Sequence, residues 1–125
     1  MEKWPIGVFT SIDAGLGVKL EVAHELGVPT IHLHAPAPET RASRTREMKE
    51  IADFARLLGC NVVALHLGFI PHNVSDPLYG QVVQVTQEVC DHCRQNGQNL
   101  HLETGQETAD SLLRFIADVT RDNLF

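Results

Sequence analysis

Long apolar runs are missing from this sequence of 125 residues, and no stretch approaches the roughly 18 apolar residues of a membrane-spanning helix. A secretion signal is also missing, because the first residues lead into a short mixed run without a small-residue cleavage site. The chain has only three cysteines, which in the absence of such a signal favour free thiols in a reducing compartment. These absences predict a cytoplasmic protein that does not enter a membrane.

Basic charge and aromatic side chains are also scarce. The formal net charge is −6 and aromatic residues make up 6% of the chain, which argues against a surface that tracks nucleic-acid phosphates and stacks bases. Glycine-rich phosphate loops are not found either: Gly15 and Gly17 lack the third glycine of a dinucleotide fingerprint, and no Gly-Lys-Ser/Thr occurs. Nucleic acid and nucleotide cofactors are therefore not the expected partners.

The sequence does contain a repeated alternation of two patterns: short apolar runs, and segments in which apolar residues recur at helical spacing. With 43% hydrophobic and 21% charged residues, the chain fits one globular domain, residues 1–125. Strands are expected at 6–10, 30–34, 61–67 and 99–103, and residues 122–125 resemble the start of a fifth. Helices are expected around 18–26, from a start within 40–46 to 58, from 77 to 96, and around 109–116. Four βα units follow one another.

Consecutive strands joined by helices lie parallel, so the fold class is α/β. Such units form either an open sheet covered on both faces or part of a (βα)8 barrel. Polar residues share one face of two strands, His32 with His34 and His101 with Glu103, which favours the barrel. Because a barrel needs about 250 residues, four units make half of one. Two open edge strands then predict a homodimer in which a second copy completes the sheet.

The strongest chemical signal is positional. His34, His66 and Glu103 each stand at the carboxyl end of an expected strand, and these ends meet at one mouth of a barrel. Two imidazoles and a carboxylate suit a divalent ion such as Mn²⁺, Mg²⁺, Co²⁺ or Zn²⁺. The sequence therefore predicts a metal site formed by these three residues, and the alternative is that they are solvated loop starts.

Four short motifs at the expected strand ends resemble one known family. They are Phe9-Thr10-Ser11, His32-Leu33-His34-Ala35-Pro36, Leu65-His66-Leu67-Gly68 and Leu102-Glu103-Thr104-Gly105. They look like the first four strand ends of the xylose isomerase-like TIM barrel superfamily, which contains sugar and sugar-phosphate isomerases and epimerases and the endonuclease IV-type nucleases. The resemblance covers nearly the whole chain and the N-terminal half of the family's barrel.

The resemblance also implies roles. Glu103 matches the glutamate that binds metal and, in the epimerases, takes part in proton transfer at the sugar carbon. His34 and His66 match histidines that are zinc ligands in the nuclease branch, whereas the equivalent positions in the sugar branch more often contact substrate. The remaining ligands of the family would lie beyond Phe125.

The leading hypothesis is accordingly a metal-dependent sugar or sugar-phosphate isomerase or epimerase, with Glu103 and His66 as catalytic residues and His34 as a metal or substrate contact. One alternative is an endonuclease IV-like phosphodiester hydrolase. The other is a half barrel without catalytic activity that only self-associates.

Further substrate contacts are expected after the second and fourth strands. Gln106 follows the fourth-strand turn, where its amide could hold a substrate hydroxyl or simply start a helix. Arg41 and Arg44 belong to a basic cluster with Arg46 and Lys49, which suits a phosphate group or a solvated helix start. Cys90 and Cys93 lie late in a helix, where packing is the expected role.

Overall fold

The computed structural model describes residues 7–9, 30–34, 41–103, 105 and 107–125. For Gly7–Phe9, Thr30–His34 and Arg44 the description is of the backbone alone. The expected helix around 18–26, the turn at 35–38 and the candidate contact Gln106 lie outside the described residues.

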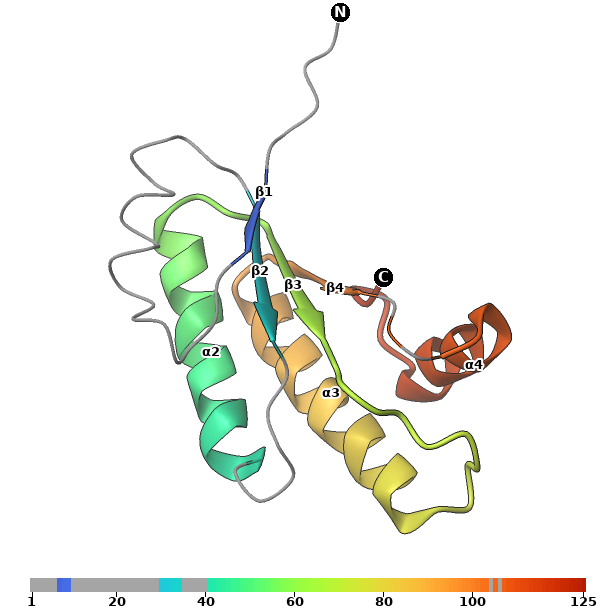
Figure 1. Ribbon diagram of the computed structural model, residues 1–125. Coiled ribbons are helices and arrows are strands. Elements are labelled where there is room, and N and C mark those ends of the chain that lie inside the picture. The colour runs from blue at the N-terminus through green and yellow to red at the C-terminus, as the bar shows by residue number, and fades with distance from the viewer. Residues whose placement is uncertain (1–6, 10–29, 35–40, 104, 106) are drawn as a thin grey trace, which may run out of the picture.

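The described elements are two strands followed by helices and strands in alternation (Figure 1). They are β1 (Gly7–Phe9), β2 (Thr30–His34), α2 (Arg41–Leu57), β3 (Val62–His66), α3 (Pro77–Gln95), β4 (Asn99–Leu102) and α4 (Ala109–Val119). All three strand pairs are parallel, and the strands follow one another in the order β1-β2-β3-β4. The prediction of an α/β fold with parallel strands is confirmed.

A fifth strand begins beside β4, as the sequence predicts. Leu124 forms a parallel bridge with Leu100. The Leu100 N–H donates to the Asn123 carbonyl at 2.8 Å, and the Phe125 N–H donates to the Leu100 carbonyl at 2.9 Å. The last residues of the chain therefore continue the ladder of the sheet past β4.

The ends of α3 and α4 follow from local chemistry. Asp76 caps α3 by accepting the Leu78 N–H at 2.8 Å, and proline follows at the first helical position, as expected. Thr108 caps α4 by accepting the Ser111 N–H at 3.2 Å. Gly97, after α3, has a φ of +72°, a left-handed conformation that glycine adopts without strain.

The core lies between the helices and one face of the sheet. Val63, Leu65 and Leu100 point to this face and are buried at 1%, 4% and 0% exposure. The helices supply the rest of the core, which includes Met48, Ile51, Ala52, Ala55, Val89, Cys93 and Phe115. Helical spacing predicts an inner stripe of Met48, Ile51, Ala52, Ala55 and Leu58 in α2. The first four are buried and Leu58 is partly buried against the core, which confirms the stripe.

Helical spacing predicts buried stripes in α3 and α4, and the structure agrees with them only in part. The expected residues are Leu78, Val82, Val85, Val89 and Cys93 in α3, of which Val89 and Cys93 are buried, and Ala109, Leu112, Leu113 and Ile116 in α4. In α3 the fully buried pair is Cys90 and Cys93, and Tyr79 is buried, whereas the expected Val85 is only half-buried. In α4 the buried residues are Phe115 and Val119, while Leu113 is 65% exposed. The Phe115 ring packs edge-on against that of Tyr79, with ring centroids 5.9 Å apart. Contacts between the two helices therefore help to determine which residues are buried.

The opposite face of the sheet carries alternate residues of the same strands. Ala64 and His66 of β3 and His101 of β4 are half-buried, and the His101 ring lies 5.5 Å from that of Phe125, which is 57% exposed. This is the face that would line the interior of a barrel. None of the helices among the described residues is both long and apolar enough to span a membrane.

Candidate active site at the carboxyl ends of the strands

The three strand-end residues singled out in the sequence lie in one row of the sheet. His34 is the register partner of His66, and Leu65 is the register partner of Leu102, so Glu103 follows at the level of His66. The Glu103 N–H donates to the Leu65 carbonyl at 2.9 Å, which fixes this alignment. Because neighbouring strands are about 4.8 Å apart, the backbones of the three residues are adjacent at one rim.

The His66 imidazole is held in a defined orientation. Its Nδ1 accepts the Gly68 N–H at 2.8 Å, so the Nδ1 lone pair is occupied. A neutral imidazole then carries its proton on Nε2, which becomes a hydrogen-bond donor. In this conformation the ring offers an N–H at Nε2 and no free lone pair for a metal ion.

Gly105 makes room for that ring. A Cβ added to Gly105 would lie 2.6 Å from the His66 Nε2 and 2.8 Å from its Cε1, closer than real Cβ atoms approach other atoms. The backbone after β4 therefore runs directly against the imidazole. Glycine at this position is a steric requirement for the observed place of His66.

Glu107 is a second acidic residue at this rim, and the sequence analysis missed it. Its Oε1 accepts the Ile70 N–H at 3.3 Å, and its Oε2 lies 3.1 Å from the position that a Gly105 Cβ would occupy. The signal that could have found it is its place four residues after Glu103, in the turn that leads from β4 to α4. Glu103 takes part in a further interaction of its own within the structure.

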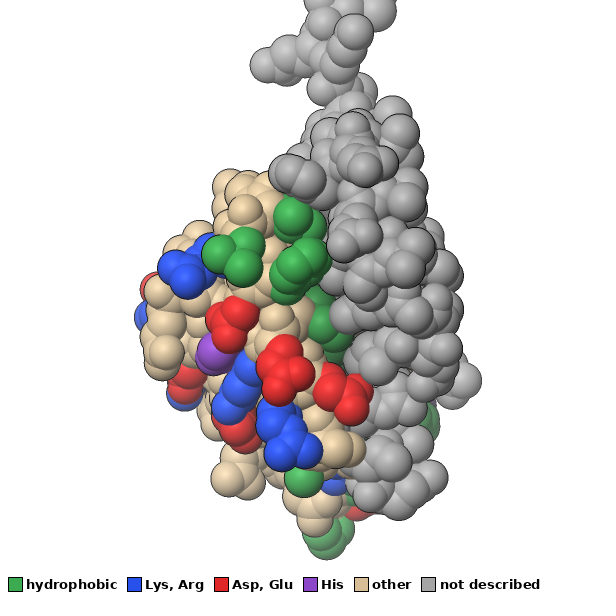
Figure 2. All heavy atoms as spheres, turned by 90° about the vertical axis from the view of Figure 1, so that its left-hand side faces the viewer, with side chains coloured by type: hydrophobic (Ala, Val, Ile, Leu, Met, Phe, Trp, Pro, Cys, Tyr) green, Lys and Arg blue, Asp and Glu red, His purple; other side chains and the backbone are tan. Residues whose placement is uncertain are grey.

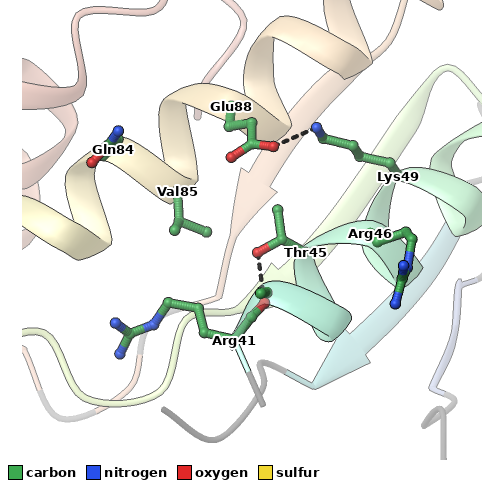
Figure 3. A pocket seen from close by; sticks show the side chains of 8 residues that line it. Arg41, Thr45, Arg46, Lys49, Gln84, Val85 and Glu88 are labelled. Atoms are coloured by element: carbon green, nitrogen blue, oxygen red, sulfur yellow. Dashed lines mark hydrogen bonds and ion pairs between the residues drawn. The ribbon is translucent and has the colours of Figure 1, made fainter. Parts of the chain in front are cut away.

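Three residues of the basic cluster, Arg41, Arg46 and Lys49, line a groove of about 620 Å³ between α2 and α3 (Figure 3). Arg41 donates from Nη1 to the Gln81 Oε1 at 2.9 Å. The Lys49 Nζ is 2.5 Å from the Glu88 Oε1, and the two side chains point toward each other in Figure 3. Neither His66 nor Glu103 is among the described residues that line this groove, so contact of Arg41 with a substrate at the rim stays a prediction, as does that of Arg44.

The surface around α2 is electrostatically mixed. In the described part of the face shown in Figure 2, acidic and basic side chains are interspersed and form no continuous basic surface. One turn beyond Lys49, the Asp53 carboxylate accepts from Asn96 and lies 2.7 Å from the His92 Nε2. These two hydrogen bonds lower the pKa of Asp53, the one from Asn96 most strongly, against a smaller opposing effect of burial.

Cys90 and Cys93 have the packing role expected from their position. Both side chains are fully buried, and burial raises the pKa of the Cys90 thiol to about 12 and that of Cys93 to about 11. A thiol with so high a pKa stays protonated at neutral pH and is a poor nucleophile and metal ligand.

The donor types at the rim fit a divalent ion, since carboxylate and imidazole are ordinary ligands of such ions. Among the residues whose side chains the structure describes, no three histidine, cysteine or carboxylate side chains are gathered closely enough to hold one. The His34 side chain is outside that description. A site would therefore combine Glu103 with His34.

The parallel strand order, the helices on one face and the polar rim define the class: this is part of a (βα)8 barrel. The chain belongs to the xylose isomerase-like TIM barrel family, whose sequence profile matches residues 14–125. A comparison with curated proteins found no match.

Solved structures of similar fold include a xylose isomerase domain protein from Planctomyces limnophilus, 44% identical with a TM-score of 0.71. The likeness covers 97% of this chain and 61% of that one. A xylose isomerase-like TIM barrel protein from Mycobacterium smegmatis, solved in complex with magnesium, is 18% identical with a TM-score of 0.71, over 94% of this chain and 49% of that one.

A third solved structure is an L-ribulose 3-epimerase, 22% identical with a TM-score of 0.68. The likeness covers 95% of this chain and 48% of that one. The chain thus spans between about half and three fifths of the length of these proteins.

Proposed function

We propose that this chain supplies the N-terminal half of the active site of a metal-dependent sugar or sugar-phosphate isomerase or epimerase. The observation that carries the proposal is the row of His34, His66 and Glu103 across three neighbouring parallel strands. A polar row at the carboxyl rim of a barrel is where substrates of such folds bind.

Glu103 is the proposed base. Its carboxylate stands at the end of β4 on the face that would line a barrel, where it can take a proton from a carbon next to a carbonyl. The same carboxylate is a proposed metal ligand together with His34. A divalent ion, when bound, supplies positive charge that offsets the negative charge developing on the substrate oxygens.

His66 is the proposed donor. The hydrogen bond from Gly68 leaves its proton on Nε2, which suits donation to a substrate carbonyl or hydroxyl oxygen. A carbonyl oxygen that gains negative charge during proton abstraction strengthens such a hydrogen bond. The geometry therefore favours His66 as a substrate contact over His66 as a metal ligand.

Two solved structures share the fold in which this chemistry is proposed. The Mycobacterium smegmatis protein was solved with magnesium, and another similar structure is an L-ribulose 3-epimerase. Both are under 25% identical to this chain, so they support the fold, and the activity comes to this chain only as a proposal. For the phosphodiester hydrolase, the net charge of −6 and the mixed charges of Figure 2 offer no support.

Exchange of solvent deuterium tests the proposed proton transfer. The protein is incubated with Mn²⁺ and a panel of ketoses and ketose phosphates in D₂O, and label at the carbon next to the carbonyl is followed by NMR. We expect labelling by the wild type and a loss of about 100-fold or more in Glu103→Gln.

The matched control is Glu50→Gln, the same change on the exposed surface of α2. Equal labelling in Glu103→Gln and in this control would remove Glu103 from the mechanism. No labelling of any sugar by a complete barrel that contains this half would remove the isomerase or epimerase assignment.

We further propose that the 125-residue chain self-associates as a homodimer. Among the described strands, β1 has a partner on one side only, and residues 123–125 pair only with β4. Unpaired strand edges tend to pair with further strands. In a two-fold dimer, β1 of each copy can pair with residues 123–125 of the other. Sedimentation equilibrium at micromolar concentration should give twice the chain mass; a single-chain mass would contradict the homodimer.

A further inference from the structure

We propose that Glu107 is a positioning residue that fixes the loop after β3 and, together with Gly105, the orientation of the His66 imidazole. This inference rests on the role proposed above for His66 as a substrate contact. It concerns a residue that the sequence patterns did not single out.

The loop after β3 is held at two points close to His66. At the first, the Gly68 N–H donates to the His66 Nδ1 at 2.8 Å. At the second, the Ile70 N–H donates to the Glu107 Oε1 at 3.3 Å, and Ile70 is itself buried at 5% exposure. The second contact joins the loop after β3 to the segment after β4, 37 residues further along the chain.

The two contacts act on the same loop. The Gly68 N–H can reach the imidazole only while the backbone from 66 to 70 keeps its present course, with Gly68 at a φ of +76°. A carboxylate that accepts the Ile70 N–H restrains that course two residues further on. Loss of the Glu107 contact should therefore loosen the hydrogen bond at His66 as well.

Gly105 supplies the opposite wall. The His66 Nε2 and the Glu107 Oε2 lie 2.6 Å and 3.1 Å from the point where a Gly105 Cβ would stand, so both side chains converge on that glycine. A methyl group there would force the imidazole out of its present position. The ring is thus held from one side by a backbone N–H and limited on the other by a backbone without a side chain.

The test reads the position of the imidazole directly. Long-range ¹H–¹⁵N spectra, recorded above the ordinary titration range of histidine, report which nitrogen of His66 carries the proton. Hydrogen exchange reports the protection of the Gly68 and Ile70 amides. Neither readout needs a substrate, so a failure of this inference can be told from a failure of the proposed function.

Three variants and one control complete the experiment. In Glu107→Ala we expect the Ile70 amide to exchange about ten-fold faster or more and His66 to lose its uniform Nε2–H signature. Glu107→Gln keeps an oxygen acceptor and should restore much of the Ile70 protection. Gly105→Ala should change the His66 signature while leaving Ile70 protected. Asp110→Ala, at an exposed acid in the first turn of α4, should change neither readout.

Wild-type exchange at Ile70 and a wild-type His66 signature in Glu107→Ala would overturn the proposal. If that variant does not fold, Glu107→Gln and Gly105→Ala decide. A His66 signature unchanged in Gly105→Ala would show that the imidazole does not lie against Gly105 and would equally overturn it.

Discussion

The two faces of the sheet are built from alternate residues of the same strands, and they differ in burial and in polarity. Toward the helices, Val63, Leu65 and Leu100 are buried among apolar side chains. Toward the other side, His66 and His101 are half-buried: His66 accepts a backbone hydrogen bond, and the His101 ring lies against that of Phe125. Apolar packing is thus concentrated on one face and the histidines on the other, because alternate residues of a strand point to opposite faces.

The comparison teaches where substitutions should be tolerated. A change to a smaller residue on the helix face removes packed apolar contacts and leaves a cavity. The same change on the opposite face removes few packed contacts. The effects of substitution on folding should therefore decline from the core to the outer surface of the helices.

The largest effect is expected for neighbouring residues of β4. Leu100→Ala should lower the free energy of unfolding by about 2–5 kcal/mol, because the side chain is fully buried in the core. His101→Ala, one residue further on the opposite face, should change it by less than about 1 kcal/mol. Urea denaturation of both variants measures the difference, and equal losses would show that the two faces are not distinct.

A smaller effect is expected at the edge of the core, where the Tyr79 hydroxyl donates to the Asp118 Oδ2 at 2.6 Å. Tyr79→Phe removes this hydrogen bond and should cost about 1 kcal/mol. In the folded protein, burial and then the Asp118 carboxylate raise the pKa of Tyr79 from 10 to about 12.

Tyr79 is the single tyrosine of the chain, so its ionisation can be followed by phenolate absorbance alone. Because its pKa is raised on folding, the stability it contributes is complete below about pH 10 and is lost as the pH rises toward 12. We expect a midpoint near 12 in the folded protein and near 10 in denaturant. A midpoint near 10 in the folded protein would place the hydroxyl in solvent.

The smallest effect is expected on the outer surface, at Asp53. Hydrogen bonds from Asn96 and His92 lower the pKa of this carboxyl on folding, so its charge stabilises the protein above the ordinary aspartate pKa of about 4. That contribution should be lost as the pH falls through the lowered pKa of the folded state. Its side chain is 51% exposed, so solvent screening limits the effect to at most about 1 kcal/mol.

The measurement is urea denaturation of wild type and Asp53→Asn between pH 2 and 7. The wild type should be slightly more stable at pH 7, and the two should converge at the acid end. A difference that instead grows toward low pH would mean that the carboxylate is not the stabilising form.

Much of this architecture can be predicted from the sequence, because helix starts and strands depend on residues that are close together in the chain. Asp76-Pro77 predicts the start of α3, the apolar run from Val62 to Leu65 predicts β3, and the alternation of polar and apolar residues predicts β4. The row of His34, His66 and Glu103 follows from the parallel order alone, once each residue is placed at the end of its strand.

Other features depend on contacts between distant segments and could not be predicted in this way. One example is the contact between Tyr79 of α3 and Phe115 of α4, whose rings pack edge-on. Helical spacing within either helix does not predict that these two residues are buried. Glu107 was missed because its partner, Ile70, lies 37 residues earlier. The Arg41 side chain likewise donates to Gln81 because α2 packs on α3, and no sequence motif indicates that contact.

Paramagnetic broadening by Mn²⁺ examines the proposed metal site most directly, because it maps proximity to the ion residue by residue. In ¹H–¹⁵N spectra, substoichiometric Mn²⁺ should broaden the amides of His66, Glu103 and Gly105 at the carboxyl rim, and Glu103→Gln should abolish that broadening. Amides beside the carboxylates of the outer helices, such as Glu88 and Asp118, should stay sharp. Broadening centred on those helices, or left intact in Glu103→Gln, would contradict a metal site at the ends of the strands.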